Sequence, residues 1–382
     1  MHVHKKFGAV AATAAAALLA TAGSAGAHEV SHDFGHWDRG GAVFVQTDNL
    51  AGNAISVYDR HPGGTLSAAG TYATGGLGGQ LAGSVVDHLA SQNSLVYDSQ
   101  VGELFAVNAG SNTVSVFDVD GDRLHLRQVL SSGGTFPASI AVHDDLVYVL
   151  NGTGGGEIQG FRLVGNGDLQ PIAGSGRALG LNPAATPQFV TTPGDIAFSP
   201  DGGQLLVTTK ANTNAIDVFG IGWNGEPSAT PVVNSEPGDV PFSLAFQGFN
   251  QVDVGEAGPN AVASFELHGN GTLTQVSSVA TGGAATCWLV ADGPQLFAGN
   301  AGSATESSVS SSWSGALSLT ATTNTDPGTV DAATSPEGRY LYVQTGANGI
   351  VDEFAVGFGG SLTEVGSVTV ANAVGGEGIA TS

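Results

Sequence analysis

Four ionisable side chains at comparable places in this sequence could carry acid/base chemistry. Asp195 and Asp331 begin the similar segments Asp-Ile-Ala-Phe-Ser-Pro and Asp-Ala-Ala-Thr-Ser-Pro, and Glu256 ends the segment Gln-Val-Asp-Val-Gly-Glu. Lys210 directly follows a segment of this second kind, Gln-Leu-Leu-Val-Thr-Thr. A lysine among carboxyl groups can have a shifted pKa, or can shift theirs toward acid/base use. We therefore predict Asp195, Lys210, Glu256 and Asp331 as catalytic residues.

Uncharged polar residues occupy the equivalent positions elsewhere in the chain, and one further glutamate, Glu377, adjoins them. Side chains of this kind around a narrow opening can hydrogen-bond a small molecule. The predicted ligand-binding residues are Asn108, Asn151, Ser139, Ser243, Asn300 and Glu377. The alternative is structural: these groups satisfy one another beside a water-filled channel, and Lys210 pairs with Asp195 or Glu256.

These positions are comparable because one segment recurs along the chain. A typical copy reads Asn-Thr-Val-Ser-Val-Phe-Asp around Val114. The copies are centred on Ile55, Val114, Ile158, Ile216, Val262, Val309 and Val351, with neighbouring centres 42 to 59 residues apart. A period of this size, enough for four short strands, is typical of propeller blades. We predict an all-β, seven-bladed β-propeller over residues 42–382.

The ends of the chain are expected to close the ring. Every repeat except the first has a short innermost strand before its second strand, as at 195–200. The last residues, Gly376–Ser382, match the start of such a strand and have no later repeat to enter. We expect them to complete the first blade, because this pairing removes the open edge between the first and last blades.

One long insertion, residues 75–93, separates the first blade from the second. Long loops on a rigid scaffold often carry function. Its glycine-rich composition is equally typical of a surface flap, so both interpretations remain open.

The N-terminus and the composition predict an exported, soluble protein. Lys5 and Lys6 precede an apolar, alanine-rich run that ends in Ala25-Gly-Ala27, the pattern of a secretory signal peptide over residues 1–27. No later apolar run is long enough to cross a bilayer. We expect a secreted monomer that begins at His28, with a tail over residues 28–41.

The charge and cysteine content exclude some classes of protein. The formal net charge is −23, and loss of the two signal-peptide lysines makes it −25. Nucleic acid is therefore not expected as a partner. The single cysteine, Cys287, excludes an intramolecular disulfide. We predict no cofactor, and a small molecule as the partner.

Two segments suggest metal binding, although the prediction is that no metal is bound. His28, His32 and His36 could hold copper through imidazole and the new α-amine, whereas such a tail is usually only mobile. The alternating carboxylates of Asp118-Val-Asp-Gly-Asp122 are typical of calcium loops. Other repeats carry glycine-rich turns at this place, so turn formation explains the second segment better.

Three segments resemble the seven-bladed lactonase family, which includes propeller 6-phosphogluconolactonases and carboxymuconate cyclases. They are Leu104–Phe117, Asp195–Gly202 and Ser335–Val343. The segments 133–139 and 284–288 resemble the family's exported bacterial branch. The resemblance covers nearly all of residues 42–382, and implies hydrolysis or formation of a lactone of a sugar or aromatic acid at the axial mouth.

The sequence also departs from this family. Similar lactonases have a Pro-His-x-His segment whose histidines would fall at Thr192 and Gly194, and neither position is histidine here. Lactone opening needs a base for water and a group that stabilises the developing oxyanion. Lys210 with Asp195 or Glu256 could supply both. The alternative is an extracellular binding or scaffold propeller without catalysis.

Overall fold

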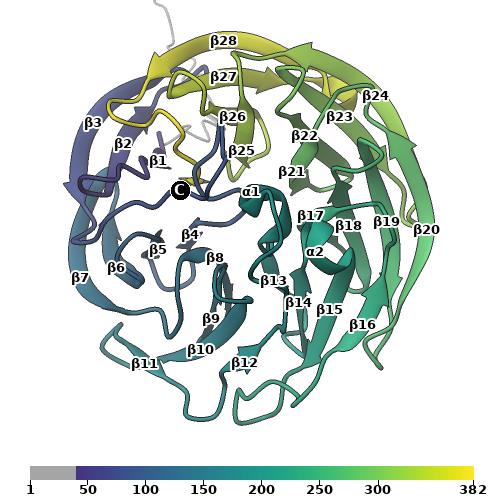
Figure 1. Ribbon diagram of the computed structural model, residues 1–382. Coiled ribbons are helices and arrows are strands. Elements are labelled where there is room, and N and C mark those ends of the chain that lie inside the picture. The colour runs from purple at the N-terminus through teal and green to yellow at the C-terminus, as the bar shows by residue number, and fades with distance from the viewer. Residues whose placement is uncertain (1–39) are drawn as a thin grey trace, which may run out of the picture. The chain divides into compact units, whose positions relative to one another are not determined.

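The computed structural model describes residues 40–382, which form seven β-sheets arranged in a ring (Figure 1). Each sheet is one blade, and its strands follow one another from the axis to the rim. This confirms the predicted seven-bladed β-propeller. The predicted signal peptide and the three histidines of the tail lie outside the described residues.

The four strands of each blade occupy equivalent places. The innermost strands, from blade 1 to blade 7, are β29 (Ile379–Thr381), β4 (Leu95–Asp98), β8 (Pro137–His143), β13 (Ile196–Phe198), β17 (Pro241–Gln247), β21 (Thr286–Asp292) and β25 (Thr329–Thr334). The second strands are β1 (Ala42–Gln46), β5 (Glu103–Asn108), β9 (Leu146–Asn151), β14 (Gln204–Thr208), β18 (Gln251–Glu256), β22 (Gln295–Asn300) and β26 (Tyr340–Thr345).

The outer half of each blade follows the same rule. The third strands are β2 (Ala54–Arg60), β6 (Thr113–Asp120), β10 (Glu157–Leu163), β15 (Ala215–Gly220), β19 (Ala261–Leu267), β23 (Thr305–Ser311) and β27 (Ile350–Val356). The rim strands are β3 (Leu66–Ala73), β7 (Arg123–Ser131), β11 (Leu169–Pro171), β16 (Val232–Ser235), β20 (Leu273–Ala280), β24 (Leu317–Asn324) and β28 (Leu362–Thr369). The remaining elements are β12 (Arg177–Ala178), which pairs with β10, and the short helices α1 (Gln188–Thr191), α2 (Lys210–Thr213) and η1 (Phe358–Gly360).

Burial explains the sequence pattern of each strand. Every residue of β5, Glu-Leu-Phe-Ala-Val-Asn, is buried, because a second strand is covered on both faces by the neighbouring blades. The rim strand β3 has its later residues alternating between exposed and half-buried. A strand covered on both faces reads as a continuous apolar run, whereas a strand with one wet face alternates.

The hydrophobic core lies between neighbouring blades. In one cluster, Phe105 and Val107 of blade 2 pack with Val149 and Phe161 of blade 3. Burial of a phenylalanine or valine side chain contributes about 1.5–3 kcal/mol. Each blade is therefore stabilised by its two neighbours, and the ring has to be closed.

The C-terminal strand closes the ring as predicted. β29 pairs antiparallel with β1, with Ile379 opposite Val45 and Thr381 opposite Val43. Ser382 extends the pairing, since its amide donates to the carbonyl of Ala42 at 2.9 Å. The two ends of the described chain thus share one sheet, with the C-terminus near the centre of the ring in Figure 1.

Residues 75–93, here called the axial insertion, run across the centre of the ring. The indole of Trp288 in blade 6 donates to the carbonyl of Ser91 at 2.6 Å, and the Ser91 hydroxyl donates to Ala138 of blade 3 at 2.8 Å. Asn93 donates to Asp195 beside blade 4 at 3.0 Å. The last residues of the insertion therefore link non-adjacent blades through the axis, whereas several residues before Asp87 are exposed at the surface.

A second covering segment, residues 179–194, joins β12 to β13 and contains α1. The amide of Ala82 in the axial insertion donates to Gln188 Oε1 of α1 at 2.8 Å. In Figure 1, α1 lies beside the centre of the ring. The two longest spacings between repeat centres, 59 residues before Val114 and 58 before Ile216, contain these two segments. Both lengthened connections thus cover the same mouth.

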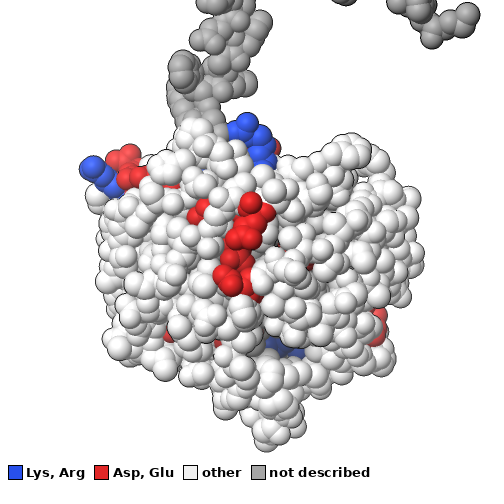
Figure 2. All heavy atoms as spheres, turned by 90° about the horizontal axis from the view of Figure 1, so that it is seen from above, with Lys and Arg blue, Asp and Glu red and all other residues white. Residues whose placement is uncertain are grey.

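The surface of the described residues carries few charges. The face in Figure 2 is mostly uncharged, with its largest group of acidic side chains near the middle and smaller acidic and basic groups toward the edges. Within residues 40–382, no helix has the length and hydropathy required to span a membrane.

Deleting residues 376–382 should destabilise the whole propeller, because it removes β29 and exposes the edge of β1. Burial of Ile379 alone contributes about 1.5–3 kcal/mol, and the buried Glu377 is lost as well. Scanning calorimetry should show a clearly lower melting temperature. Ile379→Val is the graded control, with an expected cost of about 0.5–1.5 kcal/mol. Equal melting temperatures for the truncated and full-length proteins would contradict the closure.

Gln92→Leu should destabilise the covered axis. The Gln92 amide accepts from the Leu289 backbone N–H at 2.8 Å and donates to the Leu289 carbonyl at 3.0 Å. Leucine leaves both buried backbone groups unpaired, at about 1–3 kcal/mol each. Urea unfolding measures the loss. Gln100→Leu, on an exposed turn, is the matched control and should change stability by less than about 0.5 kcal/mol. Similar effects of the two substitutions would refute the linking role of Gln92.

Candidate functional site

A cavity of about 350 Å³, here called the mouth pocket, lies under the two covering segments. Asp87 and Ala90 come from the axial insertion, and Phe189 comes from α1. Lys210 begins α2, and blades 5 and 6 supply the remaining aromatic wall. The lining includes Asp87, Phe189, Lys210, Phe242, Cys287 and Trp288. Its walls are largely apolar, with one lysine and one aspartate as the ionisable groups besides the cysteine.

Lys210 ties the two covering segments together. Its side chain is 1% exposed. Nζ donates to the carbonyl of Ala90 at 2.6 Å, to the carbonyl of Phe189 at 2.8 Å and to Thr192 Oγ1 at 3.2 Å. It also lies 5.1 Å from the centre of the Phe242 ring, a cation–π contact. These three hydrogen bonds use the three donors of the ammonium group.

Burial lowers the pKa of Lys210 to about 8, and the negative charges of Asp87 and other acidic groups oppose this shift. At neutral pH the side chain is therefore mainly charged. Among the described residues, Lys210 forms no ion pair within 4 Å with Asp195 or Glu256, the partners suggested by the sequence. Its acidic neighbour is Asp87, which no repeat position indicated.

Asp87 is the carboxyl group of this pocket, and one of its oxygens could accept a further hydrogen bond. Burial raises its pKa to about 6, while the charge of Lys210 and the backbone N–H of Ala90 act in the opposite direction. Oδ1 is buried and accepts no hydrogen bond from the described residues. An ionised carboxylate with a free oxygen can accept a proton from a bound water molecule.

Cys287 does not supply a nucleophile at neutral pH. The thiol is buried, and burial raises its pKa well above the ordinary value. The thiolate is the reactive form of cysteine, so this side chain acts as a small apolar wall. Its backbone carbonyl accepts from the hydroxyl of Ser243 at 2.5 Å, which joins blades 5 and 6.

Several buried carboxyl groups lie around the axis next to the pocket. Glu377 accepts from the amide of Ser91 and lies within hydrogen-bond distance of its hydroxyl, and its own amide donates to Asp48 at 2.8 Å. Burial raises the pKa of Asp48 to about 7 and that of Glu377 well above its usual range, with Asp87 and Asp48 adding to the second shift. Burial therefore favours the protonated form of Glu377.

Asp331 and Asp195 belong to this axial group but do not line the mouth pocket. Asp331 accepts from the amide of Ala332 at 2.9 Å, and burial raises its pKa to about 7. Asp195 accepts from Ser139, Asn93 and the amide of Leu244 at 2.9–3.0 Å. Burial nevertheless raises the pKa of Asp195 to about 7. These contacts favour a structural role, and catalysis by either residue remains a prediction.

The predicted ligand-binding asparagines are buried inside their blades. Asn108 donates to Ser115 at 2.8 Å and accepts from Asn53 at 3.2 Å. Asn300 makes the equivalent contact with Ser307 at 2.9 Å, and Asn151 donates to the carbonyl of Ser132 at 3.2 Å. Their amide groups mainly join the ends of neighbouring strands. Ligand binding by these residues, and by Ser139 and Ser243, remains a prediction.

The structure thus brings together only part of the predicted site. Lys210 is in the mouth pocket, Glu377 lies beside it, and Glu256 lies in a separate acidic group with Glu236 and Asp239. Asp87, Phe189 and Trp288 were not predicted. A signal for Asp87 existed, since Asp87 and His88 are the only ionisable residues in the axial insertion.

The two positions at which the family resemblance implies histidines are occupied differently here. Thr192 accepts a hydrogen bond from Lys210. A Cβ atom on Gly194 would lie 2.6 Å from the carbonyl oxygen of Phe242 and 3.3 Å from Cδ of Lys210. The backbone at Gly194 therefore leaves no room for a histidine, and the lysine contacts both positions.

The sequence matches no protein-family model and no curated protein sequence. Solved structures do match. A putative 6-phosphogluconolactonase from Bacteroides fragilis is 19% identical with a TM-score of 0.70, and the match covers 90% of this chain and 98% of that one. A periplasmic gluconolactonase from Pseudomonas aeruginosa is 18% identical with a TM-score of 0.72, covering 90% and 99%.

A more distant match is the apo form of AztD from Citrobacter koseri, 11% identical with a TM-score of 0.56, covering 90% of this chain and 98% of that one. At such identities a match establishes the fold alone. This chain therefore has the seven-bladed propeller fold found in 6-phosphogluconolactonase-like structures.

Proposed function

We propose that this protein is an exported hydrolase that opens a small, uncharged lactone in the mouth pocket, with Asp87 as the general base. The observation that carries the proposal is the buried Oδ1 of Asp87, which has no partner among the described residues in an apolar cavity. The fold shared with structures described as lactonases supports the reaction class.

The reaction needs only water and the groups of this pocket. Asp87 takes a proton from water as the oxygen attacks the lactone carbonyl. The ring C–O bond then breaks, and the proton returns to the departing ring oxygen, which gives a hydroxy acid. The ammonium of Lys210 favours the negative charge that develops in the transition state through its field, because its three N–H donors already have partners.

The pocket walls indicate the substrate class. Phe189, Phe242 and Trp288 present aromatic surface, and Lys210 is the single basic side chain of the lining. A phosphate dianion binds best to several basic side chains or free backbone amides. An aromatic or other apolar lactone therefore fits this pocket better than a phosphorylated sugar lactone.

One observation favours binding without turnover as a second candidate. All three donors of Lys210 are used within the fold, so no side-chain cation remains to hydrogen-bond an oxyanion in the pocket. A protein with this geometry could hold an apolar ligand without converting it. Measurement of turnover separates the two functions.

Asp87→Asn should lower the kcat/KM of lactone hydrolysis by about 100-fold or more, as expected for loss of a general base. The purified protein would be assayed against a panel of aromatic, aliphatic and phosphorylated lactones, with circular dichroism to establish that each variant folds. Asp195→Asn is the matched control and should retain most activity. A loss of activity in Asp195→Asn but not in Asp87→Asn would contradict the proposed site.

The pH profile provides a second measurement in the same assay. Because the base must be ionised, kcat/KM should rise with pH through the pKa of Asp87, about 6, and fall as Lys210 loses its charge near pH 8. Asp87→Asn should abolish the acidic limb. Ligand binding without turnover of any lactone would favour the second candidate.

A further inference from the structure

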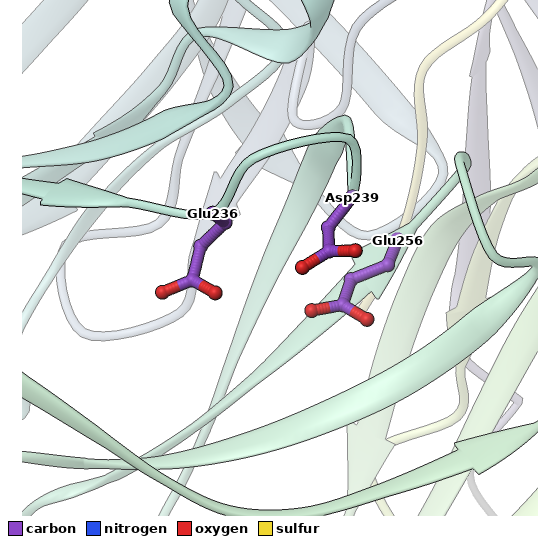
Figure 3. A group of neighbouring side chains, drawn as sticks. All are labelled: Glu236, Asp239 and Glu256. Atoms are coloured by element: carbon purple, nitrogen blue, oxygen red, sulfur yellow. The ribbon is translucent and has the colours of Figure 1, made fainter.

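Three carboxylates gather outside the mouth pocket, at the end of blade 5. Glu236, Asp239 and Glu256 each place one carboxylate oxygen within 4.8 Å of the others. Figure 3 shows the carboxylates of Asp239 and Glu256 lying close together, with that of Glu236 on the same side. Glu256 ends β18, and the other two come from the connection between β16 and β17.

The backbone fixes this arrangement. Glu236-Pro-Gly-Asp239 forms a tight turn in which the amide of Asp239 donates to the carbonyl of Glu236 at 3.1 Å. Gly238 has φ of +91°, which its lack of a side chain permits. The carbonyl of Asp239 accepts from the amide of Gly258 at 3.0 Å, which holds the turn beside the end of β18. The three side chains are therefore positioned by two anchored segments.

Glu256 gives evidence for a bound ligand that is independent of the clustering of the three carboxylates. Its side chain is 2% exposed, and Oε1 is buried and accepts no hydrogen bond from the described residues. Burial raises the pKa of Glu256, and the negative charges of Asp239 and Glu236 add to this shift, which brings the pKa to about 8. A buried carboxylate next to two others is unfavourable unless positive charge or protons compensate it.

We propose that Glu236, Asp239 and Glu256 bind a hard divalent cation, with Ca²⁺ as its best representative. The donors are carboxylate oxygens, without a nitrogen or sulfur ligand in the group, and this set suits Ca²⁺ or Mg²⁺ better than zinc or copper. Ca²⁺ accepts irregular geometry and completes its coordination with water and backbone carbonyls, whereas Mg²⁺ demands a near-ideal octahedron.

The cation would also fix one wall of the mouth pocket. Val240 follows Asp239, Ala257 follows Glu256, and both line that pocket. Val240 has φ of +51°, an unusual conformation for a β-branched residue. The amide of Ala257 donates to the carbonyl of Val240 at 3.2 Å. Binding at the carboxylates would thus hold two pocket residues in place, whatever ligand the pocket takes.

Calorimetric titration of the full-length secreted protein, treated with EDTA and dialysed, tests the site. At pH 7.5, Ca²⁺ should bind with a stoichiometry of one and a dissociation constant between about 1 µM and 1 mM, and Mg²⁺ should bind at least about tenfold more weakly. Ca²⁺ should also release protons, seen as binding heat that depends on the buffer, because Glu256 is partly protonated in the free protein.

Glu256→Gln should weaken Ca²⁺ binding by at least about tenfold. It should also raise the melting temperature of the cation-free protein, because glutamine needs neither a buried charge nor the uptake of a proton on folding. The matched control is Asp120→Asn with Asp122→Asn, which removes two carboxylates from the end of β6 and the turn that follows it, and should leave binding unchanged. Absence of Ca²⁺ binding up to about 10 mM, a range that includes even weak extracellular sites, would mean that a proton alone compensates Glu256 and would overturn the proposal. Wild-type affinity in Glu256→Gln would overturn it as well.

Discussion

Seven sheets packed in a ring leave their innermost strands facing a common axis, and in this chain the polar backbone of residues 90–93 crosses it. Backbone groups placed there must find partners inside the protein. Trp288 supplies one at the carbonyl of Ser91, and Lys210 supplies one at the carbonyl of Ala90. The side chain of Gln92 pairs in turn with the backbone of Leu289 in blade 6. The mouth pocket exists because these contacts hold the axial insertion above the blades.

The same arrangement explains why Lys210 matters, although none of its N–H donors is left to hydrogen-bond a substrate. A buried ammonium group is costly unless its protons are all accepted. Three acceptors from two covering segments meet this requirement, and the charge also favours ionisation of Asp87. Lys210 therefore positions the two covering segments. Asp87 is left as the carboxyl group of the pocket with an oxygen that accepts no hydrogen bond from the described residues.

The fold could be predicted because its signal is periodic and local. Each copy of the repeat shows which residues face a neighbouring blade, and the terminal Gly-Ile-Ala-Thr segment matched the missing strand. The site could be predicted only in part. Lys210 sits at a repeat position, so its place at the mouth was expected, whereas Asp87 lies in a segment without periodicity.

The path of that segment depends on tertiary contacts, which spacing does not encode. The same limit applies to Glu256: its end-of-strand position was correct, but its neighbours come from the turn Glu236-Pro-Gly-Asp239. Asn108 and Asn300 show a further limit, and ligand binding by them remains a prediction. A polar side chain at a strand end was interpreted as facing the opening, while hydrogen bonds within the blade hold it inside.

The pH dependence of the unfolding free energy tests the central claim, that carboxyl groups are buried around a covered axis. Burial raises the pKa of Asp48, Asp195 and Asp331 to about 7, from about 4 when unfolded. Between these values the folded state binds more protons, so stability is highest at the acidic end and falls as pH rises. Urea unfolding should give a smaller free energy at pH 8 than at pH 5. Stability that is unchanged or higher at pH 8 would contradict the account.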